Sequence, residues 1–541
     1  MPVTPTFPGI YIEEIQSSAH TITAAPTNVA VFIGYTHPFK TRSFGTPVRL
    51  FGFADYEREF GGFFYNVMYD EAQGAPFGSV AHAVNQFFLN GGSICYVVGL
   101  PLSGSTITAA TKVVGGITFT TREPTDKDHE MTIRVDNLRS GGSGSPPAMD
   151  LADVTITYGS GPGAQVEKFR QVSLDPGATT KPNPNFIEKR IGTADNPISA
   201  LITVDGGSSS PPTEFQVSVG QSEDKQTMPH SPLDGSAVFA FGDFTQVFQD
   251  NQPLDKLAVF NLLILPGITE NGILSEAARF CEKKRAFLII DPPRNSAADD
   301  NGGPITKAIE DLLSTNAFSP PVEKNAALYF PYLRSTDPVT GADIELPPAG
   351  TVAGIFGRTD NDRGVWKAPA GLETSILNSP GVVERGKMSD QQQGVLNDLG
   401  VNCLREFPGS GTVVFGARTM VTGDPALKDM WRYVPVRRMA LFLEQTLYAN
   451  LGWVVFEPND EPLWAAIRTS IEAFMLGLFR QGAFQGDTPS KAFQVKCDSQ
   501  TTTQADIDNG IVNIVVAFAP LKPAEFVIIK IAQLAGQTQT A

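Results

Sequence analysis

Histidine side chains carry much of the acid–base chemistry of proteins near neutral pH, so their positions are a first guide to catalysis. All five histidines lie in the first half of the chain and are widely scattered, at His20, His37, His82, His129 and His230. A Ser-His-Asp site or a histidine metal cluster would require long-range coincidence, and no G-x-S-x-G nucleophile elbow is present. We therefore predict no catalytic residue and no metal ligand.

The glycine-rich segments do not match the loops that cradle phosphates. GSGTVVFG, which starts at Gly409, lacks both the Walker spacing and its terminal lysine. GPGA, which starts at Gly161, lies away from any expected strand-to-helix turn. We predict no bound nucleotide or other cofactor, and we do not expect an enzyme.

Two acidic pairs offer the oxygen ligands that hard cations prefer, but neither has the spacing of an EF-hand. For Asp299-Asp300 a solvated loop is the simpler interpretation. Asp360 and Asp362 indicate a structural turn or ion pairs with Arg358 and Arg363. Neither pair is predicted to hold a metal.

Asp291 ends a predicted strand, which is where an α/β enzyme would place a catalytic acid. Pro292 and Pro293 follow it and favour a rigid turn instead. We therefore give Asp291 a structural role.

Length and charge set the outer limits. A chain of 541 residues is expected to form about two to four domains. The formal net charge of -16 argues against non-specific binding of nucleic acids or anionic membranes. No secretory signal is apparent at Met1, and apolar runs such as Leu257 to Leu265 are too short for a membrane span. We expect synthesis and folding in the cytoplasm, with any later release by lysis or in a particle.

The cysteine pattern predicts neither a zinc knuckle nor a redox pair, because the four residues are far apart, at Cys95, Cys281, Cys403 and Cys497. We expect buried, reduced thiols.

The clearest secondary structure lies near the C-terminus. Apolar residues between Leu463 and Leu478 recur every three or four positions, which predicts a helix from Glu461 to Arg480. The acidic, proline-bearing run before it suits a helix start, and Gly482 marks its end.

Strands follow this helix. Phe493, Val495 and Cys497 alternate with polar residues, which is typical of a strand with one wet face. After a turn at Asp508-Asn509-Gly510, IVNIVVAF predicts a second strand, and the apolar run from Glu525 to Ile531 is a third candidate. These elements predict a helix-backed, mainly antiparallel sheet.

Buried-strand patterns alternate with helices in two separate parts of the chain, which predicts one doubly wound α/β domain that an insertion splits. The first part holds VAVFIGYT from Val29, a helix from Ser79 to Leu89 and ICYVVGL from Ile94. The second holds KLAVFNLLILPG from Lys256, a helix from Ile273 to Arg285, AFLIIDPP from Ala286, a helix from Ile305 to Leu313 and AALYFPYL from Ala326.

The insertion is rich in Gly, Ser, Thr and Pro and carries three short strand candidates, MTIRVDNL from Met131, VTITYG from Val154 and EFQVSVG from Glu214. This composition favours a small β-sandwich or barrel that faces outward. The predicted fold is therefore mixed α/β and α+β and multidomain. It comprises an N-terminal arm and linker (1–27), the split α/β domain (28–101 and 236–347), the inserted β-rich outer domain (102–235), a C-terminal domain (348–520) and a C-terminal arm (521–541).

Several segments resemble, in the expected order, the sheath proteins of contractile phage tails and of related contractile injection systems. They are PGIYIEEI from Pro8, PAGTVAGIFGRTDNDRGVWKAPA from Pro348, WRYVPVRR from Trp431, EPNDEPLW from Glu457, GAFQG from Gly482 and FQVKCD from Phe493. The inserted region contains no such motif.

The resemblance implies a structural subunit that polymerises as stacked hexameric rings around an inner tube and contracts to drive the tube through a target envelope. Its partners would be other copies of itself, the inner tube protein, and baseplate and tail-terminator or cap proteins. Nucleic acid and direct membrane insertion are not expected. The particle would be a phage tail or a phage-tail-like, bacteriocin-like particle that assembles in the bacterial cytoplasm.

In this family the terminal arms add strands to sheets of neighbouring subunits. The resemblance places the N-terminal arm at Pro8, Gly9, Ile10, Tyr11, Ile12 and Ile15, and the C-terminal arm at Glu525, Phe526, Val527, Ile528, Ile529 and Ile531. The acceptor sheet would contain Phe493, Val495, Cys497, Ile511, Ile514 and Val516. Composition alone also fits a mobile N-terminal tail, because the spacer SSAHTITAAPT has little to bury.

Four arginines are candidates for contact with an oppositely charged tube surface: Arg432, Arg437, Arg438 and Arg468. The alternative, which we favour for any single residue, is that they form ion pairs within the subunit. Two other classes of function stay open from the sequence: a cytoplasmic α/β enzyme or ligand-binding protein, and another particle component such as a capsid or baseplate protein.

Overall fold

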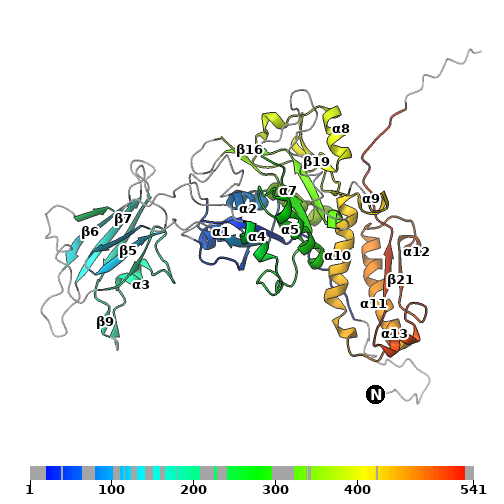
Figure 1. Ribbon diagram of the computed structural model, residues 1–541, viewed down its shortest axis with the longest axis horizontal. Helices are drawn as coiled ribbons and strands as arrows, with labels where there is room; N and C mark the ends of the chain where they lie inside the picture. Colours follow the sequence, from blue (N-terminus) through cyan, green and yellow to red (C-terminus); the bar gives the residue numbers. More distant parts are fainter. Residues whose placement is uncertain are drawn as a thin grey trace, which may run out of the picture.

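The molecule is elongated, with a central sheet, a β-rich region at one end and a layer of long helices at the other (Figure 1). The structure is a computed structural model that describes residues 20–37, 41–63, 79–101, 110–114, 116–122, 131–139, 150–158, 165–178, 181–207, 224–227, 241–294, 322–336, 338, 343–421 and 425–530. The expected strand from Glu214 and helix from Ile305 to Leu313 lie outside these residues, as do Asp299 and Asp300.

The central sheet has eight strands in the order β2-β3-β1-β13-β14-β15-β19-β20. The six inner strands pair in parallel, and β2 and β20 close the two edges in antiparallel pairing. The strands are β1 (Ala30–Tyr35), β2 (Pro47–Leu50), β3 (Cys95–Leu100), β13 (Leu262–Ile264), β14 (Phe287–Ile290), β15 (Ala326–Phe330), β19 (Val401–Phe407) and β20 (Gly411–Phe415). The chain therefore has the mixed α/β, multidomain architecture that its sequence predicts.

The boundary that we placed between residues 347 and 348 needs correction, because it cuts through this sheet. β19 lies after the boundary but pairs in parallel with β15, so that Leu328 lies opposite Val401. Parallel pairing requires a long crossover connection. Here the crossover contains α7 (Ala349–Arg363), the small sheet of β16 (Leu333–Thr336), β17 (Asp343–Leu346) and β18 (Gly381–Val382), and α8 (Asp390–Asp398).

Helices cover both faces of the sheet, so alternate residues of β1 enter different cores. Val31 and Ile33 pack with α4 (Phe241–Val247) and α5 (Asn271–Lys284). Ala30 and Phe32 face α1 (Phe53–Phe60), α2 (Ser79–Leu89) and α7. A parallel strand that is buried on both faces has a continuous run of apolar residues. This is why VAVFIGYT lacks the alternation of apolar and polar residues that a strand with one exposed face shows.

Glycines on one side of α7 allow its backbone to touch α2. A Cβ atom on Gly350 would lie 2.6 Å from the Ala83 carbonyl oxygen, and one on Gly354 would lie 2.5 Å from the Phe87 carbonyl oxygen. Gly357 follows one turn later, where a Cβ would lie 3.3 Å from the Gly91 oxygen. The segment PAGTVAGIFG is thus explained by close helix packing in one subunit.

We expect Gly354→Ala to lower the free energy of unfolding by roughly 1–3 kcal/mol, because the two helices must separate to accommodate the methyl group. Urea unfolding measures this change. Gly477→Ala is the matched control, since Gly477 lies within α11 and an added Cβ would meet no atom within 4 Å. The control should be neutral or stabilising by up to about 1 kcal/mol. An equal loss of unfolding free energy in Gly354→Ala and Gly477→Ala would contradict the close packing of α7 on α2.

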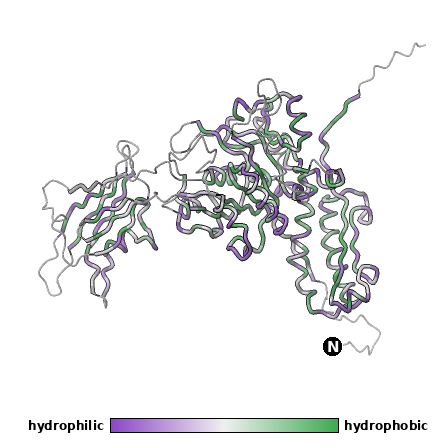
Figure 2. The backbone as a smooth tube through the Cα atoms, viewed as in Figure 1, coloured by the Kyte–Doolittle hydropathy of each residue, from purple (hydrophilic) through white to green (hydrophobic). Residues whose placement is uncertain are grey.

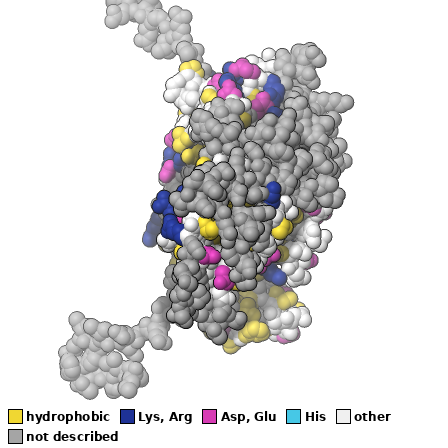
Figure 3. Space-filling model, turned by 90° about the vertical axis from the view of Figure 1, so that its left-hand side faces the viewer, with side chains coloured by type: hydrophobic (Ala, Val, Ile, Leu, Met, Phe, Trp, Pro, Cys, Tyr) yellow, Lys and Arg dark blue, Asp and Glu magenta, His cyan; other side chains and the backbone are white. Residues whose placement is uncertain are grey.

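In the described part of the inserted region, two antiparallel sheets surround a separate core, and β9 and β10 form a further two-stranded antiparallel sheet. One sheet has the order β12-β6-β7-β8 and the other β11-β5-β4. The elements are β4 (Thr111–Val114), β5 (Ile117–Thr121), β6 (Met131–Arg139), β7 (Leu151–Tyr158), β8 (Gln165–Val172), β9 (Gly177–Ala178), β10 (Lys181–Pro182), α3 (Ile187–Ile191), β11 (Ile202–Asp205) and β12 (Asp224–Thr227). Viewed from this end, the described surface carries both positive and negative side chains (Figure 3).

The C-terminal region is built on two long helices that run side by side, α10 (Val434–Asn450) and α11 (Glu461–Arg480). The α11 bounds match the sequence prediction. The smaller elements are α9 (Pro425–Trp431), the 3₁₀ turn Gly452–Val454, α12 (Pro489–Ala492), β21 (Phe493–Lys496), α13 (Gln504–Asp508) and β22 (Val515–Phe518). β21 and β22 form a two-stranded antiparallel sheet that packs on α11.

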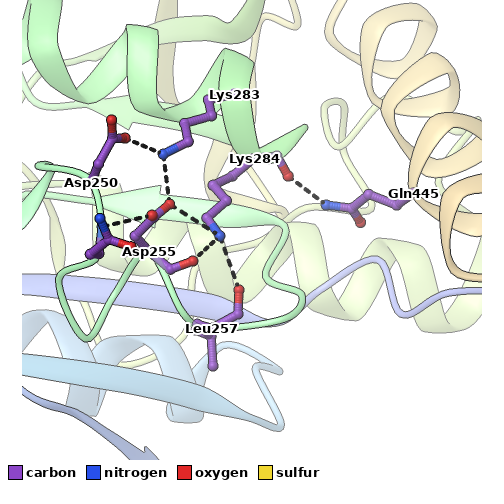
Figure 4. A network of polar contacts seen from close by, with 7 residues as sticks. Asp250, Asp255, Leu257, Lys283, Lys284 and Gln445 are labelled. Atoms are coloured by element: carbon purple, nitrogen blue, oxygen red, sulfur yellow. Dashed lines mark hydrogen bonds and ion pairs between the residues drawn. The ribbon is translucent and has the colours of Figure 1, made fainter.

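A polar network joins α10 to the central sheet (Figure 4). Gln445 of α10 donates to the Lys284 carbonyl oxygen at the end of α5, over 3.4 Å, and to the Phe260 carbonyl oxygen beside β13, over 2.9 Å. Lys283 and Lys284 both contact Asp255 in the loop before β13. The end of α5, this loop and α10 are therefore held as one unit.

Candidate functional site

An apolar stretch near the C-terminus extends away from the rest of the chain (Figure 2). The side chains of Phe526, Val527, Ile528 and Ile529 are 74–82% exposed. Single exposed apolar residues are ordinary, but four in succession mark an interaction segment or an aggregation hazard. Residues Phe526–Lys530 are the exposed, described part of the predicted C-terminal arm; Ile531 lies outside the described residues.

The base of the C-terminal arm is anchored through Glu525, which corrects the prediction that this residue contacts a neighbouring subunit, because its partners Arg418 and Tyr433 belong to its own. Its carboxylate accepts two hydrogen bonds from the Arg418 guanidinium, from Nε over 2.9 Å and from Nη2 over 2.7 Å, and a third from the Tyr433 hydroxyl over 3.2 Å. The Glu525 carboxylate raises the pKa of the Arg418 side chain. The Arg418 side chain is buried and also donates to the Asn397 carbonyl oxygen over 2.7 Å. Bidentate pairing of this kind fixes direction as well as position.

Residues 20–27 lie along α10, and, as expected of this spacer, they bury little, since Ile22 is the only buried residue among them. The Thr23 amide donates to Asn450 Oδ1 over 3.0 Å, and the Ala25 amide donates to Thr446 Oγ1 over 3.1 Å. Ile22 is buried in the C-terminal core. The chain is therefore attached to its own subunit from this segment onward, and the predicted N-terminal arm, Pro8 to Ile15, lies outside the described residues.

The sheet of β21 and β22 has two outer edges. The Ala519 amide donates to the Ala492 carbonyl oxygen directly opposite, over 2.8 Å, so this is a hydrogen-bonded pair. Hydrogen-bonded and non-hydrogen-bonded pairs alternate in an antiparallel ladder, and the second kind points its backbone groups outward. Val495 and Val516 form a pair of the second kind. Each therefore presents backbone groups along an outer edge of the sheet.

The predicted acceptor residues divide into two groups. Val495 and Cys497 are buried, and Phe493 and Val516 are partly buried, in the core that α11 covers. The second strand is shorter than we predicted, so Ile511 and Ile514 precede β22. The helix α13 and Gly510, which has a φ of 71°, occupy the approach to this strand.

The two ends of the described chain leave the C-terminal region at opposite ends of its helices (Figure 1). The N-terminal end lies beside Trp453, on which the His20 ring stacks at 3.9 Å, after the end of α10. The C-terminal arm starts near the beginning of the same helix, because Glu525 contacts Tyr433. The two described ends of the chain therefore lie in different surroundings.

Two of the four predicted tube-contact arginines are internal, so the prediction does not hold for them. Arg438 forms a bidentate ion pair with Asp360, and both side chains are at most 3% exposed. Arg437 is buried and donates to Asn325 Oδ1 over 2.7 Å. Desolvation by burial lowers the pKa of Arg437.

The other two arginines of this set are half-buried. Arg468 forms an ion pair with Glu461 over 2.6 Å and donates to the Cys497 carbonyl oxygen. Arg432 lies over the Tyr433 ring. Both reach the surface.

Asp360 does not pair with Arg358 or Arg363, as its sequence neighbourhood suggested. Its partner is Arg438, 78 positions later. Arg358 donates to the Ser375 carbonyl oxygen, and Arg363 pairs with Glu373 on the surface. The preference for a structural role over a metal site agrees with this geometry.

Asp291 is a buried connector. Its two carboxyl oxygens accept hydrogen bonds from the Gly267 amide over 2.8 Å and from the Ala349 amide over 2.7 Å. It therefore ties the turn after β13 to the start of α7. Burial raises the pKa of the Asp291 carboxyl to about 7, and the two amide donors act in the opposite direction.

The raised pKa of Asp291 predicts a loss of stability as pH rises from 5 to 8. Between about pH 4 and pH 7 the folded protein retains a proton that the unfolded chain has released, so the free energy of unfolding falls with pH. The expected fall is on the order of 2 kcal/mol, since each pKa unit corresponds to about 1.4 kcal/mol. Urea unfolding at each pH measures it.

Asp291→Asn should remove most of this slope, because the titrating group is gone. The matched control is Asp255→Asn, since hydrogen bonds from Lys283 and the Asn251 amide lower the pKa of Asp255 to about 2. That variant should keep the wild-type slope above pH 5. If Asp291→Asn leaves the slope of unfolding free energy against pH unchanged, the Asp291 carboxyl is not the group responsible for it.

All four cysteines are free and buried, as expected. Burial raises the pKa values of the Cys95, Cys281 and Cys403 thiols, so these thiols stay protonated. The described residues contain no group of three or more His, Cys, Asp and Glu side chains arranged to hold a metal. Within the same residues, no helix is both long and apolar enough to span a bilayer.

Two models of known protein families match the part of the chain from residue 254 to residue 533. Residues 254–420 match the phage tail sheath protein central domain, and residues 428–533 match the phage tail sheath C-terminal domain. The chain belongs to the phage tail sheath family. The resemblance that the sequence motifs suggested is thereby confirmed.

A curated relative in the sheath family is the tail sheath protein of Enterobacteria phage T4, which is 25% identical over 252 residues. The match covers 45% of this chain and 35% of the T4 protein, so this chain matches about a third of the length of that relative.

Solved structures share the sheath fold over nearly the whole chain. The sheath of an extracellular contractile injection system, PVC, in its contracted state has a TM-score of 0.57 at 21% identity, covering 98% of this chain and 99% of that one. A chain from the six-fold symmetrised baseplate of the anti-feeding prophage has a TM-score of 0.54 at 22% identity, covering 98% and 99%.

The sequence analysis did not predict the anchor of the C-terminal arm, which is the contact of Glu525 with Arg418 and Tyr433. Arg418 and Tyr433 lie 107 and 92 positions before Glu525, and no local pattern links them. The one available signal was Glu525 itself, a single charge that precedes the apolar run FVII. A charge in that position needs a partner if the run leaves the subunit there.

Proposed function

We propose that this protein is the structural subunit of a contractile sheath. In this proposal it polymerises as stacked hexameric rings around an inner tube and contracts to drive the tube through a target envelope. The observation that carries the proposal is the exposed C-terminal arm, which is anchored at Glu525 and pairs with no described strand of its own subunit.

The joints between subunits are proposed to be donated strands. The C-terminal arm of one copy and the N-terminal arm of another, Pro8 to Ile15, would pair with the outer edges of β21 and β22. About four backbone hydrogen bonds, each worth roughly 1 kcal/mol net, would give a few kcal/mol per arm. Repetition around rings and between rings makes such joints strong. Exposed sheet edges are otherwise hazards, and here they serve assembly.

The divisions of the chain have separate tasks in this proposal. The split α/β domain supports the C-terminal region that carries the joints, and residues 102–235 form an outer domain. Arg432 and Arg468 remain candidates for contact with the tube. The proposed mechanism uses no cofactor and no catalytic residue, because relaxation of the extended lattice forms additional subunit contacts.

The proposed partners are other copies of the chain, the inner tube protein, the baseplate, and a tail-terminator or cap protein. The similarity to a chain of a six-fold symmetrised baseplate supports hexameric rings that meet a baseplate. Assembly would take place in the bacterial cytoplasm, and a phage tail or phage-tail-like particle would be released by lysis.

Negative-stain microscopy of the protein, expressed with and without its neighbouring tube protein, tests the proposal. Long striated cylinders are expected. Discrete monomers that bind or convert a metabolite would favour an α/β enzyme or ligand-binding protein. Shells or short plates would favour another particle component.

Deletion of residues 1–16 is expected to abolish cylinders and leave a folded monomer. The deletion removes the β-prone segment but keeps His20 and Ile22, which contact the C-terminal region. Thermal unfolding and sedimentation measure the two properties. Deletion of residues 1–5 is the control and should still assemble, because Pro8 to Ile15 remain. Normal cylinders from the longer deletion would contradict a donated N-terminal strand.

A further inference from the structure

The connection between α10 and α11 presents a fully exposed phenylalanine. Phe456 has a φ of 71°, in the left-handed region that residues with a side chain rarely adopt. Val455 beside it is also largely exposed. Strained backbone persists where the surroundings enforce it, and it often accompanies function. We call residues Val455–Asp460 the tip.

The tip is held firmly by its neighbours. Asn459 accepts a hydrogen bond from the Trp464 indole over 2.8 Å and donates to the Ile511 carbonyl oxygen over 3.0 Å. The Asp460 carboxylate caps α11 by accepting from the Leu463 amide over 3.2 Å. Glu457 and Asp460 are exposed, so the tip combines an exposed aromatic group with negative charge.

A cavity of about 1030 Å³ lies at the other end of α11, between the base of the C-terminal arm and the edge of the central sheet. Trp366, Phe407 and Phe415 supply apolar surface, and Lys367 and Lys522 supply positive charge. Within the described chain, these two ammonium groups contact only carbonyl oxygens: those of Ala368, Ala370 and Asp429. The size matches pockets that enclose a drug-sized ligand, so a short turn of peptide fits.

The tip of one subunit does not reach its own cavity. The tip precedes the first residue of α11, and Gln481 and Gly482, which follow its last residue, line the cavity. A helix of 20 residues separates the two sites by about 30 Å. Any contact between them therefore joins two copies.

We propose that the tip of one subunit docks into the cavity of a second copy of this chain. Phe456 would enter the apolar part, and Glu457 and Asp460 would face Lys367 and Lys522. The two surfaces differ, so the contact is heterologous, and repetition of such a contact generates rings or helical arrays. This inference rests on the proposed sheath function and adds a contact that involves neither donated strand.

Phe456→Gly separates this role from a structural one. Glycine relieves the left-handed backbone, so the melting temperature of the monomer should stay constant or rise. Loss of the aromatic group should raise the critical concentration for cylinders by about tenfold or more, the scale of a buried aromatic anchor. Phe51→Ala removes another exposed aromatic side chain and is the control, with no expected change in assembly.

A charge exchange and a photo-crosslink identify the occupant. Glu457→Lys and Lys367→Glu should each weaken assembly, and the double variant should recover at least part of it. A photo-crosslinking amino acid at position 456 should link to peptides from residues 363–371 or 405–417 of another copy.

Other outcomes overturn the inference. Crosslinks to residues 1–19 or to the tube protein would assign the tip to a different partner. An unchanged critical concentration for Phe456→Gly, with normal wild-type cylinders, would reject this contact and leave the sheath function intact. Wild-type protein that forms no cylinders with its tube protein would reject both the docking contact and the proposed sheath function.

Discussion

Arg438→Met is expected to lower the free energy of unfolding by about 3–5 kcal/mol. The guanidinium donates to both oxygens of Asp360, over 2.8 and 2.6 Å, and also to the Thr27 carbonyl oxygen over 2.8 Å. It lies 4.7 Å from the centre of the Phe356 ring. Removal of the arginine leaves a buried carboxylate without its counter-ion, which costs more than the pair itself contributes. Urea unfolding measures the loss.

The control for this prediction is Arg468→Met, because Arg468 and Glu461 form a partly exposed pair on α11. Such pairs are worth about 0–1 kcal/mol. The double variant Arg438→Met with Asp360→Leu should be more stable than Arg438→Met alone, since no buried charge remains. If Arg438→Met loses no more unfolding free energy than Arg468→Met, then Asp360 finds another partner or becomes protonated at little cost.

Truncation after Glu525 is expected to abolish cylinders without lowering the melting temperature. The removed residues, from Phe526 onward, are exposed as far as they are described, so the monomer loses little burial. The anchor to Arg418 is retained, so the rest of the subunit keeps its contacts. Differential scanning calorimetry measures stability, and sedimentation with microscopy measures assembly.

A shorter truncation provides the control. Removal of residues 532–541 leaves the apolar run to Ile531 intact and should permit assembly. If truncation after Glu525 still yields cylinders, the C-terminal arm is not a joint. If it lowers the melting temperature by several degrees, the exposed segment packs on its own subunit.

Local sequence patterns predicted the regular elements where one segment determines its own structure. The bounds of α11 follow from the apolar period of Leu463 to Leu478 together with an acidic first turn, and Asp460 does cap the helix. The strand at Phe493 was predicted by alternation, and the long apolar runs predicted the parallel strands. In these cases propensity, periodicity and burial agree.

Contacts between distant segments were not predictable in the same way. The membership of β19 in the central sheet depends on pairing with β15, which no period within either strand encodes. Asp360 was expected to pair with Arg358 or Arg363, its neighbours in the sequence, but its partner in space is Arg438. Phe456 belongs to the apolar run WVVF, which is typical of a core, yet its side chain is fully exposed. Sequence hydropathy does not distinguish an aromatic group in a core from one on a surface.

The course of residues 20–27 along α10 has a mechanical consequence. Contacts to Asn450, Thr446 and Arg438 follow one another along the helix axis. A tension that draws the N-terminal end away from the central sheet would load these contacts simultaneously in shear, whereas a sideways pull would break them one at a time. Resistance to traction should therefore depend on its direction, and single-molecule extension along the two axes would give different rupture forces.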